Sequence, residues 1–151
     1  MADLKPILLV EDSPKDLELT LAALAKCQLA NQIVVTRDGA EALDYLFRRG
    51  DHQDRPAGNP AVVLLDLKLP KVDGLEVLEK LKRDPTTRNT PVVMLTSSRE
   101  EQDVVRSYEL GVNAFVVKPV GFQEFFEAVG DLGIFWAILN EPPPHSALMG
   151  R

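Results

Sequence analysis

Acidic side chains directly follow two of the most apolar runs in the sequence. Glu11 and Asp12 come after ILLV at residues 7–10, and Asp66 comes after VVLL at residues 62–65. Carboxylates that share a shielded site repel one another unless a cation lies between them. Carboxylate oxygens are ligands that Mg²⁺ prefers, and Mg²⁺ often binds one or two carboxylates together with a phosphate group. The three acids therefore predict a magnesium site, provided that the fold brings them together.

A hydroxyl group and an amine follow two further apolar runs. Thr96 ends VVMLT, and Lys118 follows AFVV. A hydroxyl donor and an ammonium group both suit the oxygens of a phosphoryl group, and Asp66 is the candidate nucleophile. Phosphoryl transfer depends more on positioning and charge neutralisation than on acid–base groups. These residues predict a site for a metal ion and a phosphoryl group together.

Apolar runs of strand length alternate along the chain with segments of helical periodicity. The runs cover residues 7–10, 33–35, 62–65, 92–95 and 114–117. Continuous apolar runs are typical of strands that are covered on both faces. The alternation predicts an α/β fold with a doubly wound, five-stranded parallel sheet in the flavodoxin-like order 2-1-3-4-5. Ligands of such sheets bind at the carboxyl ends of the strands, where all the residues above would converge.

Local signals mark where the helices begin and end. In SPKD, Ser13 is the expected N-cap and Asp16 the acid that meets free backbone N–H groups, and Asp38 should cap the next helix. Gly111 fits a left-handed position after a helix. The Gly- and Pro-rich segment 50–60 should be an exposed, mobile loop, and the proline-rich end of the chain an extended arm.

Composition limits the classes of function. The 151 residues, 45% of them hydrophobic, fit one domain over 1–134 and an extension over 135–151, without a separate output domain. The net charge of −6 disfavours a nucleic-acid partner. The apolar run near the N-terminus is too short for a signal peptide or a membrane span, so we expect a cytoplasmic protein that does not bind membranes. His52 and His145 form no pattern of imidazole metal ligands.

From residue 5 to about residue 130, the chain resembles the receiver domains of two-component response regulators. The matching pattern consists of Glu11-Asp12, Asp66 followed by LKLPKVDG with Pro70 and Gly74, Thr96-Ser97, and Lys118-Pro119. The resemblance implies that Asp66 accepts a phosphoryl group from the phosphohistidine of a sensor histidine kinase. It also implies that Asp12, Asp66 and the backbone carbonyl of Lys68 hold Mg²⁺, with Glu11 helping through water.

The resemblance assigns the remaining pattern residues to the phosphorylated state. Thr96 and Lys118 would each contact a phosphoryl oxygen. Phe115 lies at the aromatic switch position of the family, where the threonine moves toward the phosphoryl group and the ring turns inward. That movement would change the surface of helix 4, strand 5 and helix 5 for signalling or phosphorelay. The chain would thus be no enzyme but a phosphoacceptor that takes part in phosphotransfer and autodephosphorylation.

Three other functions are alternatives to that of a receiver. A phosphatase of the haloacid dehalogenase type wants a second acid two residues after its nucleophile, where this chain has Lys68. A flavodoxin-like flavin binder needs a phosphate-cradling loop after the first strand, where EDSP presents two acids. A pseudo-receiver, which only binds other proteins, usually lacks the acceptor or the lysine. It remains the alternative, although the sequence keeps both residues.

The last part of the chain carries more apolar bulk than one buried helix face requires. Phe135, Trp136 and Leu139 are part of this excess, which predicts an interface. This ending resembles single-domain response regulators that partner phytochrome histidine kinases and commonly dimerise. We therefore expect a phytochrome-type kinase as partner and a homodimer in which residues 135–145 reach across.

Overall fold

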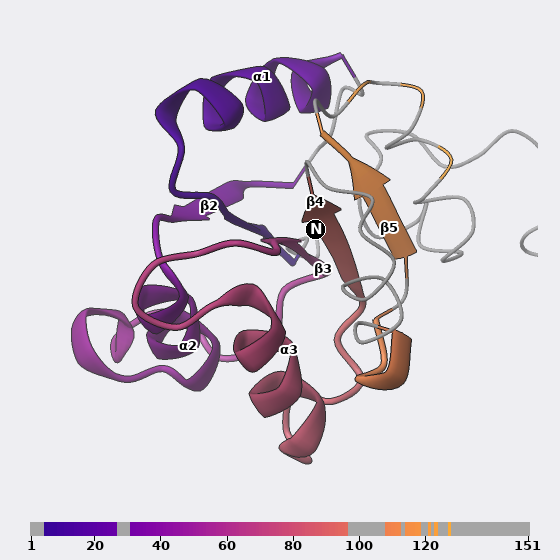
Figure 1. Cartoon of the computed structure of the whole chain (residues 1–151). Coiled ribbons are helices and arrows are strands. Elements are labelled where there is room, and N and C mark those ends of the chain that lie inside the picture. The colour runs from indigo at the N-terminus through magenta and orange to yellow at the C-terminus, as the bar shows by residue number, and fades with distance from the viewer. Residues whose placement is uncertain are drawn as a thin grey trace, which may run out of the picture.

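The computed structural model describes residues 5–26, 31–96, 108–112 and 114–118, together with Gly121, Gln123 and Glu127. Its strands are β1 (Ile7–Val10), β2 (Ile33–Thr36), β3 (Val62–Asp66), β4 (Val92–Thr96) and β5 (Ala114–Val117). Its helices are α1 (Pro14–Ala25), α2 (Gly39–Phe47) and α3 (Gly74–Arg83), and the short 3₁₀ helix η1 (Gly50–His52) follows α2. From β1 to β4, strands and helices alternate as the sequence predicts (Figure 1), and the predicted helices before and after β5 lie largely outside the described residues.

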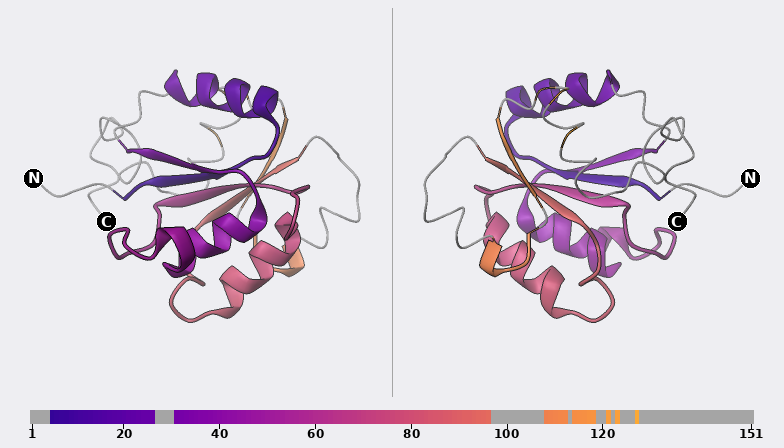
Figure 2. Two further views of the ribbon diagram at one scale, coloured as in Figure 1. Left: turned by 90° about the vertical axis from the view of Figure 1, so that its left-hand side faces the viewer. Right: turned by 90° about the vertical axis from the view of Figure 1, so that its right-hand side faces the viewer.

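The strands form one parallel sheet in the order β2-β1-β3-β4-β5, which confirms the predicted topology. Val10 of β1 pairs with Leu65 of β3, so Glu11 and Asp66 continue from neighbouring positions at one edge of the sheet. Among the described helices, α1 covers one face, whereas α2 and α3 cover the other (Figure 2). The register and the strand order together place the predicted site residues of β1 and β3 side by side.

Alternate residues of the central strands fill two cores, one on each face. Leu9 and Leu64 pack with Leu24 of α1, whereas Leu8 and Leu65 pack with Leu78 of α3. Each of these side chains is at most 1% exposed. Burying a leucine contributes about 1.5–3 kcal/mol, so both faces hold the central strands firmly. The acids that follow β1 and end β3 therefore stand on a rigid support.

The helices begin at capped positions next to the carboxyl ends of the strands. The Ser13 hydroxyl accepts a hydrogen bond from the backbone N–H of Asp16 at 3.2 Å, and Asp38 caps α2, both as predicted. Asp73 caps α3 by accepting from the N–H of Glu76 at 3.1 Å. This third cap was not predicted, although DGLE repeats the pattern of DGAE.

The loop before β3 is largely exposed, as predicted, but one arginine ties it to the protein. The guanidinium of Arg55 donates to the carbonyls of Tyr45 and Leu46 at the end of α2, at 2.5 and 3.3 Å. It also donates to Gly58 within the loop and lies 4.2 Å from the centre of the Tyr45 ring. Arg55 thus connects the end of α2 to the loop by hydrogen bonds to both. The predicted mobility of residues 50–60 stays a prediction.

Other predictions concern the second half of the chain. Gly111 has a φ of 95°, in agreement with the left-handed position that was predicted for it. Residues 135–151, the predicted extension, lie outside the described residues. In the part of the chain that the structure describes, no helix has both the length and the apolar character needed to span a membrane.

Candidate metal and phosphate site

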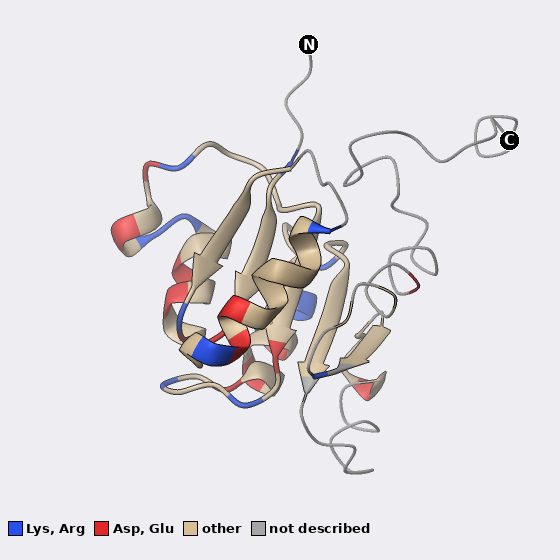
Figure 3. Ribbon diagram, turned by 90° about the horizontal axis from the view of Figure 1, so that it is seen from above, with Lys and Arg blue, Asp and Glu red and all other residues tan. Residues whose placement is uncertain are grey.

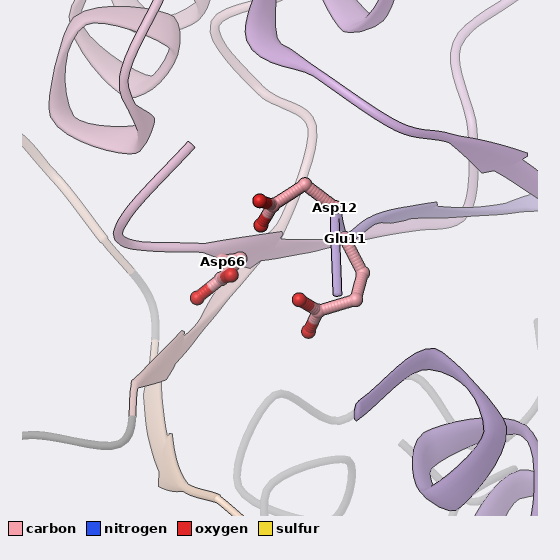
Figure 4. A group of neighbouring side chains, drawn as sticks. All are labelled: Glu11, Asp12 and Asp66. Atoms are coloured by element: carbon pink, nitrogen blue, oxygen red, sulfur yellow. The ribbon is translucent and has the colours of Figure 1, made fainter. Parts of the chain in front are cut away.

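Three carboxylates meet beyond the carboxyl ends of β1 and β3. Glu11, Asp12 and Asp66 each offer an oxygen, and these oxygens all lie within 4.8 Å of one another (Figure 4). Glu11 is completely buried and Asp66 is 4% exposed, whereas Asp12 is exposed. The cluster is therefore closed on the side of the sheet and open to solvent at Asp12.

The surroundings of Asp66 disfavour its charged form. Burial raises its pKa, and the negative charge of Glu11 raises it further, to about 7, against the opposing attraction of Lys118. A cation among these oxygens would remove the repulsion. The donors are hard oxygens on a partly open site, which is the set that Mg²⁺ prefers. The residues of the site thus fit the metal ion that the sequence predicts.

Lys118 brings a positive charge into the same cluster. Its side chain is 7% exposed, and its ammonium lies 3.0 Å from Glu11 Oε1, 2.9 Å from Asp16 Oδ2 and 3.3 Å from Asp66 Oδ2. Burial lowers the pKa of Lys118, but the hydrogen bonds to Asp16 and Glu11 and the charge of Asp66 outweigh burial, so the pKa is raised. Lys118 therefore stays charged beside the carboxylate that is the candidate nucleophile.

A close approach between α3 and β3 fixes the backbone around Asp66. The N–H of Gly74 donates to the carbonyl of Leu67 at 3.0 Å. A Cβ atom at Gly74 would overlap the carbonyl oxygen of Asp66. Only glycine lets the first turn of α3 lie against the end of β3, so Gly74 helps to hold Asp66 in place.

The family of the chain follows from a comparison with known proteins. Residues 7–130 match the response regulator receiver domain. The chain belongs to this family. Members of it are phosphoaccepting response regulators of two-component systems, and this receiver is one of them.

Similar proteins match the receiver over most of its length. The response regulator Rcp1 of Synechocystis sp. is 40% identical over 132 residues, which are 87% of this chain and 88% of Rcp1. The solved structure of the bacteriophytochrome response regulator AtBRR has 72% identity and a TM-score of 0.84, and covers 93% of this chain and 100% of AtBRR. The bacteriophytochrome response regulator RtBRR has 65% identity and a TM-score of 0.84, and the match covers 97% of this chain and 90% of RtBRR.

Not every predicted site residue of the receiver has a described side chain. Thr96 is the last residue of β4, at the same edge of the sheet as Asp66, but its side chain lies outside the described part. Lys68 is exposed just after β3. The edge as a whole carries both acidic and basic residues (Figure 3). The structure thus brings Glu11, Asp12, Asp66 and Lys118 together and leaves the hydroxyl of Thr96 unplaced.

The predicted switch residue lies on β5. Phe115 is partly buried and packs against the core on the α2 and α3 side. Its ring centre is 5.4 Å from that of Tyr108, a residue that is 55% exposed. Phe135, Trp136 and Leu139, the predicted interface residues, lie outside the described residues.

Asp16 is a site residue whose role was not predicted from the sequence. Its place in the first turn of α1 was predicted, but as a partner for free backbone N–H groups. In the structure its carboxylate instead accepts a hydrogen bond from Lys118, 102 residues further along the chain. The signal was its position, because α1 begins at Pro14, shortly after β1 ends at Val10.

Proposed function

We propose that Asp66 is the phosphoacceptor of this receiver and that a sensor histidine kinase is the donor. The observation that carries the proposal is the position of Asp66 at the end of the central strand β3, between two acids and an ammonium group. A carboxylate oxygen of Asp66 would attack the phosphorus atom of a phosphohistidine. The P–N bond breaks, the imidazole takes up a proton, and an acyl phosphate forms on Asp66.

Mg²⁺ is the proposed cofactor. Asp12, Asp66 and the backbone carbonyl of Lys68 would hold it, and Glu11 would help through water. A Mn²⁺-bound form of the similar Rcp1 has been solved. When bound, the ion supplies positive charge to the oxygens of the phosphoryl group. The carboxylates of the cluster repel one another without a cation, and a bound cation would turn that repulsion into coordination.

Lys118 and Thr96 complete the proposed site. The ammonium of Lys118 already lies 3.3 Å from the acceptor carboxylate, so a small movement would bring it to a phosphoryl oxygen. Thr96 ends the neighbouring strand β4 and would donate its hydroxyl to another oxygen. When Thr96 moves toward the phosphoryl group, the ring of Phe115 on β5 would turn inward. The same groups would serve when water hydrolyses the acyl phosphate, so the receiver takes part in its own dephosphorylation.

The kinase is proposed to be of the bacteriophytochrome type, and the protein to act in the cytoplasm. The support is the similarity to AtBRR and RtBRR, which are named as bacteriophytochrome response regulators. The test is transfer of radioactive phosphate from autophosphorylated bacteriophytochrome kinases to the purified receiver, with Asp66→Asn as control. Rapid labelling of the wild type alone is expected. Label on the Asn variant would refute Asp66 as the acceptor. If neither a kinase nor acetyl phosphate labels the wild type, the pseudo-receiver alternative is favoured.

We also propose a homodimer that uses the region around β5 and the end of the chain. Tyr108, at 55% exposure, is one of two large hydrophobic residues of the described part that are exposed, and it lies against Phe115 of β5. Residues 135–145, with Phe135, Trp136 and Leu139, would reach across to the second copy. Light scattering should give the mass of a dimer, and Trp136→Ala should weaken it. A monomer at high micromolar concentration would contradict the proposal.

A further inference from the structure

We propose that Asp16 is a positioning residue that keeps Lys118 from occupying the carboxylates needed by the metal ion. The inference rests on the metal site proposed above. Lys118 has three carboxylate neighbours, and Asp16 is the nearest, at 2.9 Å, compared with 3.0 Å for Glu11 and 3.3 Å for Asp66. An ammonium group has three N–H donors, so all three contacts form at once in the protein without a metal.

Only two of the three carboxylate partners of Lys118 belong to the proposed metal site. Glu11 and Asp66 belong to the acid cluster, whereas Asp16 is the neighbour of Lys118 that lies outside the cluster. If a dication binds to Glu11 and Asp66, their oxygens turn toward it and become poorer partners for an ammonium group. Asp16 then supplies the remaining negative charge beside Lys118, whose side chain is nearly buried. A nearly buried ammonium without a carboxylate partner is costly, so Lys118 would otherwise compete with the metal ion.

The helix start explains why Asp16 is available for this contact. The backbone N–H of Asp16 is already satisfied by the Ser13 hydroxyl, and Pro14 at the first position of α1 has no N–H. Its carboxylate is one-third exposed, so desolvation costs less there than at Glu11. The sequence EDSPKD thus places two acids of the cluster, Glu11 and Asp12, within six residues of chain that also contain Asp16, the partner of Lys118.

Binding of Mn²⁺ to the full-length receiver tests the inference without any phosphoryl transfer. Free Mn²⁺ is counted by electron paramagnetic resonance in wild type and in Asp16→Asn. The variant should bind Mn²⁺ about three- to fivefold more weakly, the size of a partly exposed ion pair. Glu18→Gln is the matched control, because it removes the same charge from an exposed position of the same helix, and it should change the affinity by less than about 1.5-fold.

A double-mutant cycle separates positioning from a simple charge effect. The negative charge of Asp16 attracts the metal ion through space whether or not Lys118 is present. Asp16→Asn lowers the affinity for Mn²⁺ by some factor in each background. In a Lys118→Met background this factor should be at least about three times smaller than in the wild type. Equal factors in both backgrounds would overturn the inference. A wild type that binds no Mn²⁺ would refute the proposed metal site itself, which is a distinguishable result.

The side-chain ammonium of Lys118 provides a second readout. In Mg²⁺-saturated wild type, its ¹H–¹⁵N signal, identified by its absence in Lys118→Met, should persist because Asp16 still holds the group. The signal should be lost in Asp16→Asn and should return at least in part in Asp16→Glu. An unchanged signal in Asp16→Asn would contradict the proposed role. Thermal unfolding of each variant establishes that the fold is retained.

Discussion

At the scale of single residues, Asp66 links the chemistry of the site to the pH dependence of stability. Its pKa is raised to about 7 by burial and by Glu11, whereas an aspartate in an unfolded chain has a pKa of about 3.9. Between these values the native protein holds a proton that the unfolded chain has released. Stability without metal therefore falls as pH rises from about 4 to about 7 and does not fall further above this window through this group.

Replacing Asp66 by asparagine should remove this pH dependence. In EDTA at pH 8, Asp66→Asn should raise the free energy of unfolding by on the order of 2 kcal/mol, and the gain should vanish toward pH 4. Urea titrations across this range measure both effects. Because the variant keeps the shape of the side chain, packing should be unchanged. A gain of the same size at pH 4 and pH 8 would show that the charge of Asp66 is not its cause.

At the scale of elements, the contact between α3 and β3 depends on Gly74. A methyl group at this position would overlap the carbonyl oxygen of Asp66, so Gly74→Ala should cost about 2–4 kcal/mol of stability and slow phosphorylation. Gly58→Ala is a useful control, because its Cβ would meet nothing within 4 Å and the cost would be backbone strain alone, about 1 kcal/mol. Denaturant unfolding and acetyl phosphate labelling provide the two measurements, and equal losses in both variants would contradict the steric argument.

The loop between α2 and β3 depends in the same way on Arg55. Arg55→Ala removes hydrogen bonds to the carbonyls at the end of α2 and the contact with the Tyr45 ring, and it should cost about 2 kcal/mol. Arg55→Lys should recover little of this, because one ammonium group does not reproduce a planar fork of donors. Arg83→Ala removes an exposed ion pair with Glu79 and should cost at most about 0.5 kcal/mol. A loss in Arg55→Ala no larger than in Arg83→Ala would show that the loop is not tied down in solution.

At the scale of the whole molecule, the sequence predicted what local patterns determine. Continuous apolar runs predict the strands, and a few neighbouring residues predict two of the three N-caps of the described α-helices. Glu11, Asp12 and Asp66 were expected to converge because strand order alone brings neighbouring strand ends together. The contact between Asp16 and Lys118 was missed because it joins residues 102 positions apart and needs the packing of α1 on the sheet. The composition of the loop likewise gave no sign that Arg55 would reach back to α2.

The acid cluster couples metal binding to the stability of the whole molecule. A ligand that binds only the native state adds RT ln(1 + [L]/Kd) to the free energy of unfolding, about 2.7 kcal/mol at a hundredfold excess over Kd. Mg²⁺ should therefore raise the unfolding temperature of the wild type progressively with its concentration. In Asp12→Asn, which removes the charge of the exposed acid of the cluster, the same rise should need at least about tenfold more Mg²⁺. Thermal melts in a Mg²⁺ series measure this, and Ca²⁺- and Mg²⁺-free buffer gives the baseline. Identical Mg²⁺ curves for both proteins would place the stabilising ion elsewhere on the molecule.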